Sequence, residues 1–530
     1  MFTLDHGQVI TDVDNAEFVT DCAAYLLQRI KTRQASLAII GLGYVGLPLA
    51  VAYAEAGFHV TGLDIDARRV DALNAGRSPV ADVPSERLRP LLPQTLSPND
   101  SMTTLNTGIV GISKGNGSNG NGRANGNGHA NGNGHANARP STNGDRGPDV
   151  SLQGGVTQLA PARGSFRATT DYDVLFDVDA VIICVPTPLS STKDPDMSFI
   201  ISASDEIARR LHSGMLIVLE STTYPGTTEE IILPRLHSVR VGDATLQVGK
   251  DFFLAFSPER IDPGRTDWTV YTTPKVVGGT TPQCLEVVRT LYGSAIQTVV
   301  PVSKTQTAEM VKLLENTFRA VNIALINEVA IMCDRLDVDV WEVVEAAKTK
   351  PFGFMPFYPG PGLGGHCIPI DPHYLAWKLR TLNYTARFIE LAEEINFGMP
   401  HYVLGKISDA LNEESKPLRG SRVLVLGAAY KADISDMRES PTLDLLRLLR
   451  EKGAHVDYND PFVPRLTLGA DVMTSVPLTE ELLQAADCVV ISTPHSSYDW
   501  QWVLENTCLV MDTRNATGKT PNGSAKVVKL

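Results

Sequence analysis

The chain contains 530 residues, 43% of them hydrophobic and 20% charged, which is enough for two or three domains with apolar cores. The formal net charge of −13 argues against nucleic acid or an anionic membrane surface as a partner. No apolar run approaches the roughly 18 residues of a membrane-spanning helix, and the first residues lack the basic-then-apolar pattern of a secretion signal. We therefore expect a cytoplasmic protein.

Seven cysteines are scattered along the chain without paired spacing. The absence of Cys-x-x-Cys and zinc-type motifs favours a reducing compartment over a disulfide framework, and we expect no metal site. An isolated cysteine in such a chain is most often a buried apolar residue.

Residues 15–33 carry apolar residues at helical spacing and predict a short helix. A complete βαβ unit follows, with a buried strand over 36–40, a small-residue helix over 47–57 and a second strand over 59–63. The turn Gly-Leu-Gly-Tyr-Val-Gly precedes the helix, whose N-terminus can hold a pyrophosphate. We expect a dinucleotide to contact this turn at Gly41, Gly43, Tyr44, Val45 and Gly46.

Asp64 ends the second strand, 18 residues beyond the last glycine, near the spacing of the acid that binds the ribose hydroxyls. A carboxylate there favours NAD over NADP because it repels a 2′-phosphate. Arg68 and Arg69 follow; an arginine can accept that phosphate, and both can equally be solvated helix residues. We assign Arg69 to the NAD site together with Asp64.

Residues 93–162 are dominated by Gly, Asn, Ser and His and cannot bury a core. We expect a disordered loop expanded within the first domain. His129 and His135 could bind a metal weakly, but a functionally silent insertion is the simpler interpretation.

Three further strands that end in polar turns are expected over 180–185, 215–219 and 252–256. In open α/β sheets ligands bind at the carboxyl ends of the strands, so Thr187 and Thr222 are expected near the cofactor. Ordinary turn chemistry explains either threonine equally well. Glu259 and Arg260 follow the last of these strands in the same way.

One long helix is expected over 305–336. Lys312 and Asn316 are four residues apart and share one face, with Arg319 adjacent to it. Such residues on an apolar helix usually mark a solvated edge, so this face alone does not identify a site. A helix of this length between two α/β halves also predicts a dimer seam, and hence a homodimer or higher homo-oligomer.

The segment Gly360-Pro-Gly-Leu-Gly-Gly-His-Cys-Ile-Pro-Ile-Asp371 sets Cys367 behind a run of glycines and Asp371 four residues later. A thiolate is a strong nucleophile, and a glycine such as Gly364 lets the backbone approach a substrate. The alternative for Cys367 is a buried structural cysteine. The flanking glycines and Asp371 favour the nucleophile.

A linker over 412–420 leads to a third domain that opens with a strand over 422–426. Its turn lacks the glycine fingerprint, which is typical of a Rossmann-type half that binds another nucleotide. Strands near Val456 and over 489–491 and 509–511 complete a small parallel sheet. Lys431 and Arg438 are candidate phosphate contacts, although both can be surface charges.

The predicted fold class is α/β, with two Rossmann-like parallel-sheet domains joined by a long central helix. The predicted parts are an N-terminal helix (1–35), an NAD-binding domain (36–303), a central helical domain with the dimer seam and the cysteine loop (304–412), and a C-terminal domain (418–530).

Taken together, these motifs resemble the nucleotide-sugar (UDP-sugar) 6-dehydrogenase family. The likeness runs from about residue 35 to 515, apart from the 93–162 insertion. It is carried by Gly41–Gly46, Val185–Pro188, Ser257–Arg260, Lys312–Asn316, Gly364–Cys367 with Asp371, and Lys431 through Asp436–Pro441. The amino-acid sequence of residues 351–372 looks most like that of the branch acting on UDP-N-acetylglucosamine. The lack of basic residues at 351–354 counts against the mannosamine epimer.

The resemblance implies two successive NAD-dependent oxidations at sugar C6, through a thiohemiacetal and a thioester on Cys367. It implies that Lys312 stabilises oxyanions, Asn316 binds the sugar or a water, and Asp371 is a general base or a partner of Lys312. It further implies that Glu259 assists hydrolysis and that Thr222 holds water or cofactor. The substrate contacts it implies are Arg260, Ile261, Lys312, Asn316, Arg319, Gly364 and Lys431, with Arg438 on the cofactor side and the C-terminal domain binding the UDP-sugar.

Three alternatives stay open. The substrate could be UDP-glucose or UDP-N-acetylmannosamine. A two-electron hydroxyacid dehydrogenase would share the architecture without needing Cys367. A nucleotide-binding regulator would keep the fold and lack turnover.

Overall fold

The protein is described by a computed structural model that covers residues 22–80, 82–93, 164–190, 192–241, 244–261, 267–518, 520 and 523–530. The helix expected over 15–33 is present as α2 (Cys22–Lys31), and residues 15–21 lie outside the described residues. Residues 94–162, which contain nearly all of the Gly/Asn-rich segment, also lie outside them.

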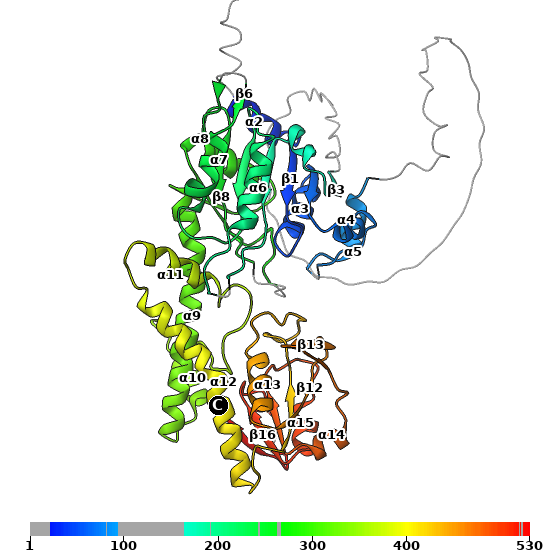
Figure 1. The fold of residues 1–530 in the computed structure, drawn as a ribbon, viewed down its shortest axis with the longest axis vertical. Coiled ribbons are helices and arrows are strands. Elements are labelled where there is room, and N and C mark those ends of the chain that lie inside the picture. Colours follow the sequence, from blue (N-terminus) through cyan, green and yellow to red (C-terminus); the bar gives the residue numbers. More distant parts are fainter. Residues whose placement is uncertain are drawn as a thin grey trace, which may run out of the picture. The chain divides into compact units, whose positions relative to one another are not determined.

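The larger sheet has eight strands and begins at the βαβ unit predicted from the sequence (Figure 1). All neighbouring strands are parallel except β8 and β9, which are antiparallel. The order across the sheet is β10 (Val299–Val302), β9 (Lys275–Gly279), β8 (Phe253–Phe256), β5 (Leu216–Leu219), β4 (Ala180–Ile183), β1 (Ser36–Ile40), β2 (His59–Leu63) and β3 (Ser165–Thr169). The run from β3 to β8 reproduces the 3-2-1-4-5-6 order of a dinucleotide-binding sheet.

Apolar cores lie on both faces of this sheet. Leu37 and Ile39 of β1 pack in one core and Ala38 and Ile40 in the other, since alternate residues of a strand point to opposite faces. The helices of this part are α2, α3 (Gly46–Glu55), α4 (Ala67–Asn74), α5 (Ser85–Leu88), α6 (Ser198–Ala208), α7 (Leu233–His237) and α8 (Pro282–Tyr292). Short elements are η1 (Arg89–Leu91), η2 (Tyr172–Asp177), the π-helical η3 (Thr228–Ile232), and the hairpin of β6 (Arg240–Val241) and β7 (Ala244–Thr245).

The long helix expected after the sheet is confirmed as α9 (Thr305–Arg335), which has 31 residues. It packs along α12 (Arg387–Glu413), and Figure 1 shows the two helices side by side, α9 in green and α12 in yellow. The shorter helices α10 (Val340–Lys348) and α11 (Asp371–Thr381) also contact α9. Neither α9 nor any other helix in the described part of the chain is both long and apolar enough to cross a membrane.

The smaller sheet is parallel throughout, as predicted, and has five strands. Its order is β12 (His455–Asn459), β11 (Arg422–Leu426), β15 (Cys488–Ile491), β16 (Leu509–Asp512) and β17 (Lys526–Lys529). The remaining elements are α13 (Pro441–Glu451), α14 (Glu480–Ala485), α15 (Trp500–Glu505), and the hairpin of β13 (Arg465–Leu468) and β14 (Asp471–Thr474). Separate apolar cores cover its two faces.

A buried pair of amide side chains joins α9 and α12 to the start of the cysteine loop. The Asn327 side-chain N–H donates to Asn396 Oδ1 at 2.9 Å, and Asn396 donates in turn to the Ala320 carbonyl at 3.2 Å. Asn327 Oδ1 accepts from the Gly360 backbone N–H at 2.9 Å. Because buried polar groups must be paired, these bonds fix where the loop leaves the helices.

We expect Asn327→Leu to lower the melting temperature by several degrees. The change leaves the Gly360 N–H and Asn396 Oδ1 buried without this partner, at a cost of about 1–3 kcal/mol for each group. Differential scanning calorimetry measures the effect. Asn322→Leu is the matched control, because Asn322 donates only within its own helix, to the Phe318 carbonyl. Equal melting temperatures for both variants would show that Asn327 does not hold the cysteine loop at the helices.

Candidate active site

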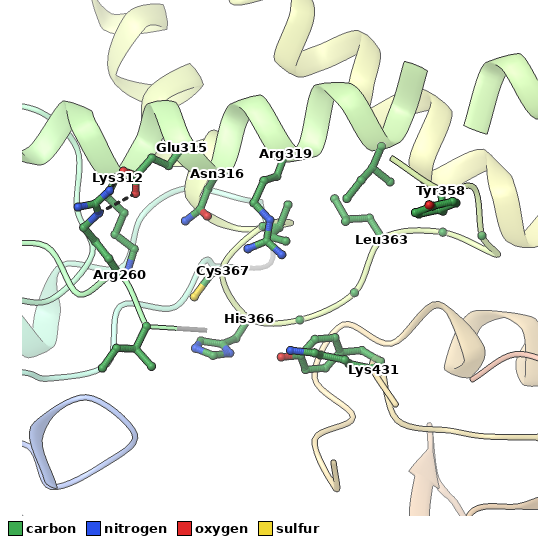
Figure 2. A pocket seen from close by; sticks show the side chains of 18 of the residues that line it. Arg260, Lys312, Glu315, Asn316, Arg319, Tyr358, Leu363, His366, Cys367 and Lys431 are labelled. Atoms are coloured by element: carbon green, nitrogen blue, oxygen red, sulfur yellow. Dashed lines mark hydrogen bonds and ion pairs between the residues drawn. The ribbon is translucent and has the colours of Figure 1, made fainter. Parts of the chain in front are cut away.

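A cavity of about 300 Å³ brings together residues from five separate stretches of the chain. The cysteine loop forms one wall, α9 forms another, and the loop after β11 contributes from the smaller sheet (Figure 2). The residues predicted from the sequence that line it are Glu259, Arg260, Ile261, Lys312, Asn316, Arg319, Gly364, Cys367 and Lys431. The fold therefore gathers side chains that are up to 255 residues apart, from Glu259 to Arg514.

Helix α9 presents Lys312, Asn316 and Arg319 toward Cys367, as Figure 2 shows. Steps of four and three residues keep these side chains on one face of a helix. Lys312 and Asn316 are buried, each 8% exposed, so the solvated-edge interpretation of this face is wrong.

Asp371 lies behind Asn316 and is not part of the cavity wall. It is 2% exposed, and its Oδ2 accepts from the Asn316 side-chain N–H at 2.5 Å. Burial raises the pKa of Asp371 to about 6, against the lowering effects of Lys312 and of the Asn316 hydrogen bond. A carboxylate with such a pKa can accept a proton near neutral pH.

Lys312 carries the positive charge at the centre of the site. Burial acts to lower its pKa, but the neighbouring Cys367, Asp371 and Glu259 outweigh burial, so the pKa lies above its ordinary value. The Lys312 ammonium therefore stays protonated while it faces the cysteine.

The Glu259 carboxylate is held by three donors. Its Oε1 accepts from the backbone N–H groups of Arg260 at 2.8 Å and Ile261 at 2.7 Å, and its Oε2 accepts from Lys275 Nζ at 2.8 Å. Burial acts to raise the pKa of Glu259, but Lys275 more than offsets it, so the pKa lies well below its usual range. Glu259 is thus an anion at neutral pH.

Arg260 is fixed at the cavity edge by a two-bond ion pair with Glu315. Its Nη2 lies 2.5 Å from Glu315 Oε1 and its Nε 3.2 Å from Oε2, and its Nη1 donates to the Pro274 carbonyl at 2.8 Å (Figure 2). Such a paired guanidinium presents a fixed charge.

The cysteine loop approaches the smaller sheet so closely that a side chain cannot be inserted. A Cβ added to Gly364 would lie 2.7 Å from Tyr430 Cβ and 3.0 Å from the Glu439 carbonyl oxygen. The next residue, Gly365, donates its N–H to the Arg438 carbonyl at 3.0 Å. Glycine at 364 therefore permits contact between the loop that carries Cys367 and the loop that carries Lys431.

The glycine turn has the features of a pyrophosphate cradle. Gly41 has φ +94°, and a Cβ there would lie 2.5 Å from the Cys184 carbonyl oxygen, so the turn requires glycine. Gly43 faces open space, with nothing within 4 Å of an added Cβ, beside the N-terminus of α3. These residues fit a dinucleotide phosphate, which needs both close backbone approach and a helix N-terminus.

Asp64 lies buried at the end of β2, as its role toward a ribose requires. Its Oδ2 accepts from the Leu42 N–H at 3.0 Å and from Arg69 Nη1 at 2.7 Å, and its Oδ1 accepts from the Asp66 N–H at 3.0 Å. Arg69 is thereby paired with Asp64, whereas the Arg68 side chain is 93% exposed.

A second group of contacts joins the glycine turn to the smaller sheet. The Arg438 guanidinium carbon lies 5.0 Å from the centre of the Tyr44 ring, and Tyr44 lies 6.4 Å from the ring of His366. Arg438 also bonds Asp436, with Nη2 to Oδ2 at 2.6 Å. Arg438 thus reaches the predicted cofactor turn from the loop after β11.

Thr187 and Thr222 lie outside the cavity wall. Both are half-buried, in the turns after β4 and β5, and the Thr187 carbonyl accepts from the Tyr374 hydroxyl at 2.9 Å. Their cofactor roles stay predictions.

Several cavity residues were missed in the sequence: Glu315, Tyr358, His366, Tyr430 and Arg514. Arg514 was detectable, because it lies two residues beyond the carboxyl end of β16, where parallel sheets bind ligands. Its Nε donates to the Ser492 carbonyl at 3.0 Å, and burial lowers its pKa to about 10. Glu315 and His366 are adjacent to predicted residues, but nothing in their type marks them as cavity residues.

Comparison with known families identifies three successive domains. Residues 35–102 and 151–296 match the NAD binding domain of the UDP-glucose/GDP-mannose dehydrogenase family. Residues 306–397 match the central domain of that family, and residues 424–519 match its UDP binding domain. The cofactor of the larger sheet is therefore NAD.

Individual relatives cover most of the chain. A UDP-N-acetyl-D-glucosamine 6-dehydrogenase of Pseudomonas aeruginosa is 35% identical over 357 residues, which are 67% of this chain and 82% of that protein. An NDP-N-acetyl-D-galactosaminuronic acid dehydrogenase of Ralstonia nicotianae is 30% identical over 87% of this chain and 91% of that one. The solved structure of a UDP-D-ManNAc dehydrogenase from Pyrococcus horikoshii is similar with a TM-score of 0.71 and 28% identity, covering 93% and 98% of the two chains.

We expect Gly43→Ala to weaken NAD binding at least about tenfold while the melting temperature stays unchanged. The added methyl group meets no protein atom within 4 Å, so any loss of affinity reports on the approach of the cofactor. Isothermal titration calorimetry with NAD gives the affinity. Gly398→Ala is the control, because Gly398 also has open space but lies on α12. Unchanged affinity in Gly43→Ala would move the pyrophosphate away from this turn.

Proposed function

This chain belongs to the UDP-glucose/GDP-mannose dehydrogenase family, and on that premise we propose that it oxidises C6 of a UDP-sugar from alcohol to carboxylate in two steps. The relatives are UDP-sugar dehydrogenases, so the chain is an NAD-dependent oxidoreductase. The observation that carries the proposal is Cys367 in a cavity wall, faced by Lys312 and Asn316.

The larger sheet holds the cofactor in this proposal. Gly41, Gly43, Tyr44, Val45 and Gly46 surround the pyrophosphate, Asp64 binds the ribose, and Arg69 orients Asp64. NAD+ supplies the hydride acceptor for both oxidations. Thr187, Thr222 and Arg438 are the other proposed cofactor contacts.

Cys367 makes the second oxidation possible. The thiolate sulfur adds to the C6 aldehyde carbon, and the carbonyl oxygen becomes the thiohemiacetal oxygen. This adduct can lose a hydride from C6, which a free aldehyde does far less readily, and a thioester results. Water then adds to the thioester carbonyl, the C–S bond breaks, and the thiol and a carboxylate are released.

Lys312, Asn316 and Asp371 have separate roles in these steps: charge stabilisation, binding and proton transfer. The Lys312 ammonium stabilises the oxyanion that forms when sulfur or water adds to C6. Asn316 holds the sugar or a water and is itself oriented by its 2.5 Å hydrogen bond to Asp371. Asp371, whose pKa is raised to about 6, is the better proton acceptor.

Glu259 has a different task from Asp371. Because its carboxylate is held by three N–H donors and its pKa is lowered, it is a weak base. We assign to it the orientation of the attacking water as a fixed hydrogen-bond acceptor, which assists hydrolysis of the thioester. Thr222 is proposed to hold that water or the cofactor.

Positive groups around the cavity suit the diphosphate of the substrate. Arg319, Lys431 and Arg514 line the cavity, and Arg260 adds a charge fixed by Glu315. Ile261 and Gly364 complete the proposed substrate contacts, Gly364 by leaving room for the sugar beside the backbone. The UDP moiety is assigned to the smaller sheet, in line with the matched domain.

UDP-N-acetylglucosamine is the proposed sugar. Two relatives with this substrate in their names are 35% identical over 357 residues and 29% identical over 466, and the galactosaminuronic acid and mannosamine enzymes are 30% identical, so identity alone does not separate these sugars. The amino-acid sequence of the loop over 351–372 supports UDP-N-acetylglucosamine. UDP-glucose and UDP-N-acetylmannosamine are the alternative substrates.

The boundaries at 1–35, 36–303, 304–412 and 418–530 stay predictions. We also propose a cytoplasmic location, because Cys367 must remain a reduced thiol for the proposed chemistry.

A second copy of the chain is the proposed partner of the exposed apolar face of α9 and α12. Phe318, Leu325 and Met332 recur every seven residues on α9 and are 45–54% exposed. Phe388 and Leu391 on α12 are 75% and 52% exposed. Large apolar side chains that gather on two packed helices are typical of a homodimer interface.

The stoichiometry of NADH tests the function. We expect two NADH for each UDP-N-acetylglucosamine consumed, measured at 340 nm with the uronic acid quantified by mass spectrometry. The galacto and manno epimers and UDP-glucose are run in parallel, and the best substrate identifies the sugar. One NADH per sugar would instead establish a two-electron dehydrogenase, and no turnover on any of them would leave a nucleotide-binding protein.

Cys367→Ser provides the matched variant for this assay. It should reduce formation of the uronic acid by at least about 10³-fold, because a hydroxyl is a much weaker nucleophile than a thiolate, while NAD affinity is retained. Turnover near that of the unmodified chain would refute the covalent mechanism.

The double variant Phe318→Glu/Leu325→Glu should convert the dimer to a monomer. Burying two carboxylates in an apolar interface costs several kcal/mol, which exceeds what most interfaces tolerate. Light scattering coupled to size-exclusion chromatography gives the mass. Val472→Glu, at an exposed apolar residue of the smaller sheet's hairpin, is the control. An unmodified chain that elutes as a monomer would overturn the proposed interface.

A further inference from the structure

Lys275, a buried lysine outside the cavity, holds the carboxylate of Glu259, which lines the cavity. Lys275 is the first residue of β9, the strand that runs antiparallel to β8. Because of this reversal, the first residue of β9 lies at the edge where β5 and β8 end, and Glu220 and Glu259 follow those two strands. The direction of one strand therefore brings a lysine to the carboxyl edge of the sheet.

Lys275 bridges the two glutamates. Its Nζ lies 2.8 Å from Glu259 Oε2 and also forms an ion pair with Glu220. Lys275 is 3% exposed and Glu220 1% exposed, so water does not screen these charges. The second oxygen of Glu220 accepts from the Tyr292 hydroxyl, which leaves each carboxylate oxygen of Glu220 with a partner.

The charged and titratable groups around Glu259 come from five elements or their ends. Lys275 from β9 and Lys312 from α9 are positive, and Glu220, after β5, is negative. Cys184, after β4, and Tyr292 on α8 are neutral thiol and phenol groups, whose pKa values burial raises well above their ordinary values. Lys275 is the group in direct contact with both carboxylates.

The electrostatics of the two glutamates differ although they share one lysine. Burial raises the pKa of Glu220 against the effect of Lys275, while Lys275 and two backbone N–H groups bring the pKa of Glu259 below its usual range. Of the two neighbouring carboxylates, Glu220, which lies away from the cavity, is therefore the one that takes up a proton first. Without the lysine, Glu259 would compete for that proton.

We propose that Lys275 is a positioning residue: braced by Glu220, it holds the Glu259 carboxylate ionised and fixed at the cavity wall, so that Asp371 and not Glu259 sets the acid limb of thioester hydrolysis. This inference rests on the proposed function, in which Glu259 orients the hydrolytic water. Lys275 and Glu220 do not line the cavity, so the inference concerns only the step that Glu259 assists, which is hydrolysis.

The test is the pH dependence of uronic acid formation by Lys275→Met, combined with a rapid-mixing measurement of NADH. Methionine has similar length and no charge, so Glu259 and Glu220 are left to share a proton. We expect the pKa of Glu259 to rise past that of Asp371, because the buried carboxylate loses its contacting ammonium, and the acid limb of kcat to move up by at least about one pH unit. The pre-steady-state burst of two NADH per active site should remain, because both hydride transfers precede hydrolysis.

The double variant Lys275→Met/Glu220→Gln separates charge from structure. Removing the competing carboxylate should move the acid limb part of the way back toward that of the unmodified chain, since Glu259 stays buried without the Lys275 ammonium. A simple packing defect would leave the limb displaced as in the single variant. The double variant also removes the buried excess negative charge, so it stays informative where Lys275→Met does not fold.

Lys526→Met is the matched control, because Lys526 also bridges two glutamates, Glu413 at 2.8 Å and Glu414 at 3.0 Å, but on the exposed surface. Its acid limb should coincide with that of the unmodified chain. An unmoved limb in Lys275→Met, or a limb displaced as far in the double variant as in the single variant, would overturn the inference. Failure of the unmodified chain to form two NADH per sugar would instead refute the proposed function.

Discussion

The site depends on a balance of buried charges. Lys275 and Lys312 lie among three buried carboxylates, Glu220, Glu259 and Asp371. An unpaired buried charge is expensive, so each group must be arranged against the others. The arrangement makes the carboxylates unequal: Glu259 is held as an anion, while Glu220 and Asp371 retain raised pKa values. One carboxylate can then orient a water while another accepts its proton.

Helix α9 provides the rigid frame for this balance. Glu309, one turn before Lys312, accepts from the N–H groups of Gly226 and Thr228, which ties the turn after β5 to the helix. Asn316 bonds Asp371 of α11, and Asn327 bonds the start of the cysteine loop. A single straight element thus sets the distances among groups from several parts of the chain, which side chains on separate loops would hold less accurately.

Close backbone contact completes the site. Gly364 lies against Tyr430, and the Gly365 N–H bonds the Arg438 carbonyl, so the loop that carries Cys367 is joined to the loop that carries Lys431. Arg438 in turn contacts Tyr44 of the glycine turn. The glycine turn, the cysteine loop and the smaller sheet are therefore linked through neighbouring backbone segments and one arginine.

The sequence by itself determined the α/β class, the βαβ unit, the helix of residues 305–335 and the family, because periodicity and glycine motifs are local properties. It also identified Cys367, Lys312 and Asn316. It did not reveal Lys275, because a single lysine in a strand has the same local pattern as a surface lysine. It did not reveal Arg514 either. Only the tertiary structure decided their surroundings, because the antiparallel direction of β9 and the meeting of loops from both sheets are set by long-range packing. The unequal pKa values of the three carboxylates likewise depend on burial and on neighbours up to 72 residues away, which no local pattern encodes.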